Sequence, residues 1–241
     1  MSTYEGYRLK GYHLKDALGD PYVGRVVLDS FEVISVAGEG SFARAYLAHQ
    51  LGTERKAIVK IAHDHLLDGD RANAIRQYFA NELRASTRVK HPNLVTIYTA
   101  GETDEGAPAI AMEYVDGVSL EQLLIQQAPL PARLSCALFH QLLQAIHELH
   151  NAGIVHCDIS PTNVMVQSGG SLLRAVLLDF GIARLEPEWD TPPRDLVQGT
   201  PGYTAAEQLE GNSVPASDIF SLGALMWWAF SGEECFAGVE T

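Results

Sequence analysis

The alternation of apolar and polar positions predicts a strand-rich first part of the chain. Short runs with a two-residue period, or rich in β-branched residues, are typical of strands. Such runs occur at Val33–Val36, Arg44–Ala48, Ala57–Ile61, Leu94–Ala100 and Ala109–Met112. The turn Asp68-Gly69-Asp70 is followed by a predicted helix over about residues 71–89. We expect residues 1–30, ahead of the first strand, to form a loosely ordered arm.

Helical periodicity characterises the second part. Pro131 begins a long helix in which leucine and alanine recur at helical spacing, and Gly153 ends it. A shorter helix is predicted from Ser119, because Gln122 follows three residues later in the manner of a capping box. The run Asp218–Phe230 is apolar at nearly every position, which predicts a helix that is buried on every side.

The order of these elements predicts an α+β fold of two lobes that join near Glu113–Asp116. The chain has 241 residues, of which 46% are hydrophobic and 20% charged, so it can bury a sizeable core. Its net charge of −13 argues against nucleic acid or an anionic membrane as the main partner.

The cysteines and the N-terminus bear on the compartment. Cys136, Cys157 and Cys235 are widely spaced and odd in number, which favours a reducing compartment without a disulfide framework. Residues 1–20 lack the apolar segment of a signal peptide. The most apolar run, Ile219–Phe230, is too short to span a bilayer. These features predict a cytoplasmic protein with no membrane partner.

One segment combines polar residues whose spacing suggests chemistry. Asp158 is followed five residues later by Asn163, and Asp179 lies directly before Phe180-Gly181. Phosphoryl transfer needs a carboxylate that orients a hydroxyl and oxygen ligands that hold magnesium at the nucleotide phosphates. Aspartate and asparagine are also common in turns, but the preceding His156 and the flanking apolar strands disfavour that simpler interpretation. The segment resembles the catalytic loop and metal-binding turn of the protein kinase family.

The resemblance implies a role for each of these residues. Asp158 would orient the acceptor hydroxyl, and Asn163 and Asp179 would hold Mg²⁺. Lys60, in an apolar strand, would contact the α and β phosphates of ATP and pair with Glu82 on the predicted helix. Without the family pattern, this lysine would be an ordinary edge-strand residue and this glutamate an ordinary surface residue.

A glycine-rich turn resembles the family's G-x-G-x-x-G loop, in which glycines bring backbone N–H groups against phosphates. Two glycines between strands otherwise make a plain hairpin. The loop positions expected at the nucleotide are Ala37, Gly38, Glu39, Gly40, Ser41, Phe42, Ala43, Arg44 and Ala45. The resemblance also places Ile58 and Met112 beside the adenine ring, with main-chain groups of Glu113 and Val115 binding it. Ala45 and Ile58 exchange the large and small residues usual at these two positions, so the volume over the ring is nearly kept.

Two later motifs resemble the protein kinases in particular. Gly199-Thr200-Pro201-Gly202-Tyr203, followed by Ala205-Ala206-Glu207, is similar to the end of the activation segment. Asp218-Ile219-Phe220-Ser221-Leu222-Gly223 is similar to the start of the helix that anchors the catalytic loop. These motifs distinguish protein kinases from small-molecule kinases of similar fold, and the first favours Ser/Thr substrates.

Further departures from the family pattern lie around the catalytic aspartate and in the glycine-rich turn. Cys157 stands where arginine usually precedes the catalytic aspartate, and Ser160 stands where lysine usually follows it. Ala43 replaces the third glycine of the loop. We place Ser160 among the catalytic positions. Ser160, Ala43 and Ile58 leave open the alternative of a pseudokinase that binds nucleotide or only a partner. A small-molecule kinase of similar fold is a third interpretation, and the activation-segment motif speaks against it.

We predict a bacterial-type Ser/Thr protein kinase domain that transfers the γ-phosphoryl group of ATP to protein hydroxyls with Mg²⁺. Residues 31–115 would form the N-lobe and residues 116–241 a C-lobe that lacks its last helices. In the family, those helices cover part of the region equivalent to Asp218–Phe230. We therefore expect an open apolar surface there, through which the chain associates with itself or with a partner chain.

Overall fold

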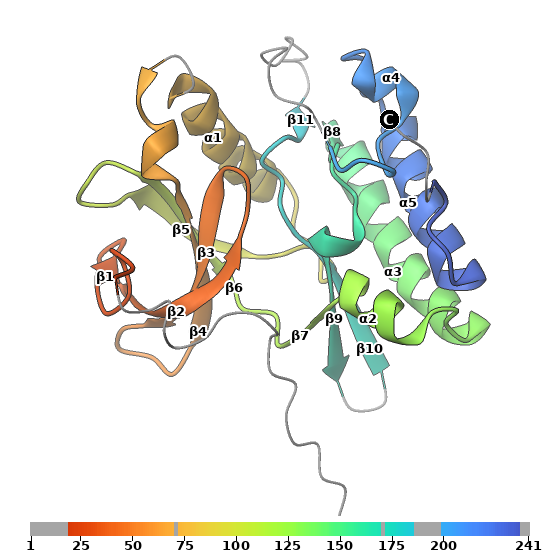
Figure 1. Ribbon diagram of the computed structural model, residues 1–241, viewed down its shortest axis with the longest axis horizontal. Coiled ribbons are helices and arrows are strands. Elements are labelled where there is room, and N and C mark those ends of the chain that lie inside the picture. The colour runs from red at the N-terminus through yellow and green to blue at the C-terminus, as the bar shows by residue number, and fades with distance from the viewer. Residues whose placement is uncertain (1–18, 70–71, 170–171, 186–198, 237–241) are drawn as a thin grey trace, which may run out of the picture. The chain divides into compact units, whose positions relative to one another are not determined.

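A computed structural model describes residues 19–69, 72–169, 172–185 and 199–236 (Figure 1). The chain divides into two compact units. The first unit consists of Met1–Arg71 and Tyr98–Tyr114. The second unit consists of Ala72–Ile97 and Val115–Thr241. One passage between the units, at Tyr114 and Val115, falls within the predicted junction.

The first unit is built on one six-stranded sheet with the order β1-β2-β3-β4-β6-β5. Its strands are β1 (Val26–Val27), β2 (Phe31–Glu39), β3 (Ala43–Gln50), β4 (Lys56–Ala62), β5 (Ile97–Glu102) and β6 (Pro108–Glu113). A short 3₁₀ helix, Asp64–Leu66, follows β4. The predicted strands are confirmed, although Leu94 lies ahead of β5 and makes an isolated bridge with Leu177 instead.

One face of this sheet forms the core of the first unit. Strand side chains alternate between faces, and the alternation buries Tyr46 and Ala48 on β3 together with Val59 and Ile61 on β4. The same cluster includes Tyr22, Val27, Phe31, Val33, Ala57, Ala107, Ala109 and Ala111. The opposite face of β3 and β4 is therefore available for function.

The arm expected over residues 1–30 is corrected for its second half. Residues 1–18 lie outside the described residues, but Tyr22 and Val27 are buried in the core of the sheet and β1 pairs with β2. The Asp20 carboxylate accepts hydrogen bonds from the Tyr22 backbone N–H and from Arg44 of β3. Two apolar anchors and one buried carboxylate thus fix this segment to the unit, which a search for strand periodicity alone could not detect.

The second unit is mainly helical, with two small sheets. Its helices are α1 (Ala72–Arg88), α2 (Leu120–Gln127), α3 (Ala132–Asn151), α4 (Ala206–Leu209) and α5 (Pro215–Ser231). Its strands are β7 (Gly117–Ser119), β8 (Ile154–Val155), β9 (Val164–Gly169), β10 (Leu172–Leu177) and β11 (Arg184–Leu185). The orders are β10-β9-β7 and β11-β8. In Figure 1, α3 and α5 run side by side beside the β9–β10 hairpin.

Helix α1 groups with the second unit, whereas the predicted division kept all of residues 31–115 together. The helix itself confirms the prediction over 71–89 to within one residue at each end. Its buried side chains follow helical spacing and include Tyr78 and Glu82. The physical reason for the grouping is that α1 contacts β11 and that the Tyr78 hydroxyl donates to Asp179, two residues after β10.

The local signals at the other helix ends act as predicted. The Ser119 side chain accepts a hydrogen bond from the Gln122 N–H at 3.1 Å, which caps α2. Pro131 directly precedes α3, and the helix stops before Gly153, which has a positive φ of 70°.

The prediction that the Asp218–Phe230 helix is buried on every side is wrong, because α5 is apolar nearly all round but is buried on one side only. Leu222 and Leu225 are buried, and the helix contacts α3 and β8. On the other side Ile219, Phe220, Trp227 and Phe230 are exposed, with 56% of Trp227 accessible to solvent. The expected open apolar surface is thus present on the described chain. No helix among the described residues is both long and apolar enough to cross a membrane.

Candidate active site

Strand register gathers the predicted nucleotide residues of the first unit on one face. Ala45 of β3 lies opposite both Gly38 of β2 and Lys60 of β4. Ile58, two residues before Lys60, lies opposite Met112 of β6. Because facing residues share a side of the sheet, the side chains of Ala45, Lys60, Ile58 and Met112 lie on the face opposite the core, and Gly38 adds a position without a side chain. Ala45 and Ile58 are diagonal neighbours there, which supports the predicted exchange of small and large residues.

The glycine-rich turn is a tight connection between β2 and β3. The Gly40 N–H donates to the Ala43 carbonyl at 2.9 Å, and the ring of His63, just after β4, places Nε2 2.8 Å from the Gly40 carbonyl. Arg44 pairs with Glu39 across the base of the turn, and the two hydrogen-bonded acids Glu39 and Asp20 raise the pKa of the Arg44 guanidinium.

The missing third glycine has a local explanation. Ala43 is the first residue of β3, where it pairs with Ala62 and is buried. This extended position suits alanine without strain, since only a left-handed backbone would demand glycine. The departure at Ala43 therefore leaves the turn intact.

In the second unit, the β9–β10 hairpin brings the two predicted metal ligands to the same end of a sheet. Val164 lies opposite Leu177, so Asn163 directly precedes one strand and Asp179 follows the other by two residues. The Leu178 N–H also donates to the Asn163 carbonyl at 2.8 Å. Register alone thus positions residues that are sixteen apart in sequence.

The Asp158 carboxylate is held by one donor on each oxygen. Its Oδ2 accepts from Asn163 Nδ2 at 2.7 Å, and its Oδ1 accepts from the Thr200 hydroxyl at 2.7 Å. Because the amide nitrogen of Asn163 is used in this contact, its Oδ1 is the atom with the chemistry to bind a cation. The carboxylate therefore has a fixed orientation before any substrate binds.

The loop that carries Asp158 is fastened by a second, fully buried carboxylate. Asp218 of α5 accepts hydrogen bonds from the backbone N–H groups of His156 and Cys157, both at 2.9 Å. Its Oδ2 also lies 2.8 Å from Nε2 of His150 on α3. The imidazole of His156 completes the frame, with Nε2 2.9 Å from the Leu178 carbonyl and Nδ1 accepting from the Asp158 N–H.

Cys157 and Ser160, the two departures beside Asp158, are both buried. Cys157 adopts a left-handed backbone with φ of 68° and donates its thiol to the Val155 carbonyl. The Ser160 hydroxyl lies 2.9 Å from the Thr162 hydroxyl and has no accessible surface. A buried serine supplies no positive charge, so the cation that lysine provides at this position in the family is not supplied by Ser160.

Lys60 and Glu82 belong to different units. Lys60 is half-buried on β4, and Glu82 is completely buried on α1. The simpler interpretation of Glu82 as a surface residue is therefore wrong. Burial of a carboxylate is costly unless it is compensated.

Glu207 of α4 accepts a hydrogen bond from the Ser217 hydroxyl at 2.6 Å, which is the main cause of the lowered pKa of this carboxyl. Ser217 also caps α5, because its hydroxyl accepts from the Val214 N–H. One serine thus connects the end of the activation-segment motif to the helix that anchors the catalytic loop.

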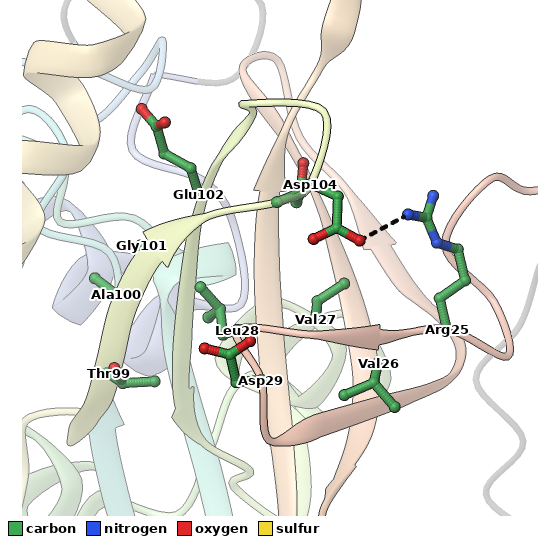
Figure 2. Close-up of a pocket in the computed structure, with 11 residues that line it drawn as sticks. Arg25, Val26, Val27, Leu28, Asp29, Thr99, Ala100, Gly101, Glu102 and Asp104 are labelled. Carbon is green, nitrogen blue, oxygen red and sulfur yellow. Dashed lines mark hydrogen bonds and ion pairs between the residues drawn. The ribbon is translucent and has the colours of Figure 1, made fainter.

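One pocket of the first unit is separate from these residues. Figure 2 shows the residues that line it, from the β1–β2 turn with Leu28 and Asp29 and from the Thr99–Glu102 stretch of β5. The cavity has a volume of about 260 Å³. A dashed line joins Arg25 to Asp104, whose closest charged atoms are 3.5 Å apart. None of the predicted site residues lines this cavity.

Two residues that hydrogen-bond to the predicted site residues were not identified from the sequence as members of the site. Thr200 was noted as part of a motif, but its bond to Asp158 spans 42 positions. Tyr78, on α1, donates to Asp179 across 101 positions. The only sequence signal for Tyr78 is its place four residues before Glu82, which puts both on one side of a helix.

Together, a strand-rich unit with a glycine-rich hairpin and a helical unit carrying the Asp158, Asn163 and Asp179 set define the two-lobe fold of protein kinases. A family model for the protein kinase domain matches residues 31–241. The chain belongs to this family.

The curated relatives include bacterial Ser/Thr kinases. The chain is 32% identical over 219 residues to "Serine/threonine-protein kinase pkn3" of Myxococcus xanthus, covering 88% of this chain and 40% of that protein. It is 36% identical over 218 residues to pkn2 of the same organism, covering 88% and 26%. Against PknB of Mycobacterium leprae it is 31% identical over 215 residues, covering 87% and 34%. The chain thus spans well under half the length of each.

The anchoring role of Asp218 predicts a large loss of stability when it is removed. Asp218→Ala leaves two buried backbone N–H groups and His150 without their acceptor, so the free energy of unfolding should fall by about 3–5 kcal/mol. Urea denaturation measures this change. Asp104→Ala, which removes an exposed ion pair with Arg25, should leave the curve almost unmoved. A similar small shift for Asp218→Ala would show that the loop is held by other means.

The burial of Cys157 predicts selective thiol chemistry. Burial, and then the negative charge of Asp218, raise the pKa of the Cys157 thiol to about 12, whereas Cys136 and Cys235 are exposed. Because the thiolate is the reactive form, Ellman's reagent should titrate two thiols in the native protein and a third only after unfolding. Rapid reaction of all three in native buffer would contradict this description.

Proposed function

We propose that the chain is the catalytic domain of a Ser/Thr protein kinase that transfers the γ-phosphoryl group of ATP to a hydroxyl of a protein. The observation that carries the proposal is the Asp158 carboxylate, oriented by Asn163 and Thr200. The family match and the names of the bacterial relatives support the same assignment. Because the chain spans only part of those relatives, the activity stands as our proposal.

Asp158 orients the acceptor and takes up its proton. The hydroxyl oxygen forms a bond to the γ-phosphorus while the bond from that phosphorus to the leaving ADP oxygen breaks, and the hydroxyl proton passes to the Asp158 carboxylate. A carboxylate held on both oxygens loses little freedom when substrate arrives, which is the main benefit of positioning.

The metal ligands would be Asn163 and Asp179. Amide and carboxylate oxygens are the ligands that magnesium prefers, together with phosphate oxygens, so the donor atoms at the end of the β9–β10 hairpin fit this cation. When bound, magnesium neutralises charge on the phosphates.

Most of the proposed nucleotide-binding residues belong to the first unit. The turn from Ala37 to Ala45 would contact its phosphates, with Lys60 as the phosphate-binding cation and Glu82 as its partner. The adenine ring would lie by Ile58 and Met112, with main-chain contacts from Glu113 and Val115. The shared sheet face described above supports this assignment.

Ser160 has a more limited role in our proposal. Its hydroxyl shapes the loop through Thr162 and does not replace the family's lysine. The transfer step therefore relies on Lys60 and the metal for positive charge. If the chain binds nucleotide but transfers nothing, this lack of a cation beside Asp158 favours the pseudokinase alternative.

We further propose a cytoplasmic setting in a bacterial cell. The three free cysteines fit a reducing compartment, and the named relatives come from bacteria. The substrate would be a protein, and the net charge of −13 is compatible with a basic one.

Replacing the acceptor-orienting carboxylate tests the proposed chemistry. Asp158→Asn should lower the turnover by about 10²–10⁴-fold, because general acid–base positioning contributes that much to the rate. ATP affinity measured by calorimetry should hardly change, since this group acts in the transition state. Asp104→Asn, an isosteric change on an exposed turn, is the control and should match the wild type. Wild-type turnover in Asp158→Asn would exclude this role.

We also propose that the exposed side of α5 mediates self-association. Trp227 and Phe230 contribute to a continuous apolar surface around Gly223 and Met226, and such surfaces drive association in water. Sedimentation velocity of the chain over a wide concentration range should show dimers or larger species. Trp227→Glu combined with Phe230→Glu should shift the chain to monomer, whereas Ile125→Glu on the exposed face of α2 should not. A wild-type chain that stays monomeric and binds no apolar dye would contradict the proposal.

A further inference from the structure

A tyrosine of α1 contacts the carboxylate that ends the β9–β10 hairpin. The Tyr78 hydroxyl donates to Oδ1 of Asp179 at 2.6 Å. Tyr78 is 8% exposed, so little water competes for this contact. A hydrogen bond to an ionised acceptor is roughly twice as strong as a neutral one. The contact is therefore a strong local constraint on Asp179.

The same oxygen is held from a second side. The Gly181 N–H donates to Asp179 Oδ1 at 3.1 Å. Two donors on one oxygen fix the rotation of the carboxylate about its side-chain bonds. Asp179 also has a left-handed backbone, with φ of 59°, a conformation that persists in a non-glycine residue only when its surroundings impose it.

Gly181 fixes the tyrosine ring as well. A Cβ atom built on Gly181 would lie 1.9 Å from Cζ of Tyr78 and 2.1 Å from a neighbouring ring carbon. No side chain other than hydrogen fits at this position while the ring stays in place. The ring thus lies directly against the backbone of the turn, which blocks any movement of the ring toward Gly181.

We infer that Tyr78 is a positioning residue for the divalent cation, a role that rests on the proposed function of Asp179. By engaging Oδ1 together with Gly181, Tyr78 directs metal ligation to Oδ2 and holds that oxygen in one orientation. Carboxylates that bind metals are commonly held by such hydrogen bonds, and loss of one typically weakens metal binding by about 10–100-fold. The tyrosine also makes cation binding depend on the placement of α1.

Tyr78→Phe removes the hydroxyl and keeps the ring. The dissociation constant of Mn²⁺, measured by electron paramagnetic resonance with a non-hydrolysable ATP analogue present, should rise by about 10-fold or more. The Mg²⁺ concentration for half-maximal transfer should rise in parallel, while turnover at saturating Mg²⁺ changes little. Tyr46→Phe is the matched control, because it removes another buried tyrosine hydroxyl bonded to a carboxylate, Asp20. It should leave Mn²⁺ binding unchanged.

A second variant keeps the inference testable if Tyr78→Phe fails to fold. Gly181→Ala forces the ring away from Asp179 and should weaken Mn²⁺ binding although Tyr78 is present. Adding Tyr78→Phe to Gly181→Ala should then cause little further loss, because both changes remove one interaction. Full additivity of the two losses would overturn the inference.

The remaining outcomes separate this inference from the proposed function. Unchanged or tighter Mn²⁺ binding in Tyr78→Phe overturns the positioning role, and tighter binding would mean that the hydroxyl competes with the cation. A wild-type chain that binds no Mn²⁺ with the nucleotide analogue also overturns it. A wild-type chain that binds Mn²⁺ normally but transfers no phosphoryl group contradicts the proposed function alone.

Discussion

A single buried carboxylate, Asp218, fixes the geometry on which the candidate site depends. It accepts the backbone N–H groups of His156 and Cys157 and contacts His150, so it ties the catalytic loop to α5 and α3 at once. A charged group without accessible surface is tolerated only when its oxygens are satisfied. The loop conformation that satisfies Asp218 is also the one that carries Asp158 toward its two donors.

The fold was predictable where its signals are local. Strand alternation and the helix starts at Ser119 and Pro131 depend on neighbours within a few residues, and the structure confirms them. The predicted adenine-side positions Ala45 and Ile58 also lie on one sheet face, because register follows from the hairpins. The anchoring of Tyr22 was missed, since its burial depends on a sheet assembled from residues far along the chain.

The main residues of the candidate site were predictable from the sequence, but the hydrogen bonds that hold them were not. The family resemblance supplied Asp158, Asn163 and Asp179, but hydrogen bonds that span 42 and 101 positions arise only when helices and loops pack. The departures also gain physical meaning only in three dimensions. Cys157 is a buried thiol within the loop frame, and Ala43 begins a strand. Cys157 and Ser160 both stand where the family usually has a basic residue. The missing charge at Ser160 is the one that bears on the transfer step, because the lysine usual there helps to neutralise the transferring phosphoryl group.

The central claim is that this loop transfers a phosphoryl group despite that missing charge. The most direct measurement incubates the purified chain with Mg²⁺, γ-labelled ATP and a basic protein, followed by phosphoamino-acid analysis. Our account predicts label on serine or threonine that requires Mg²⁺. Tight binding of ATP with no label on protein, at any Mg²⁺ concentration, would contradict it.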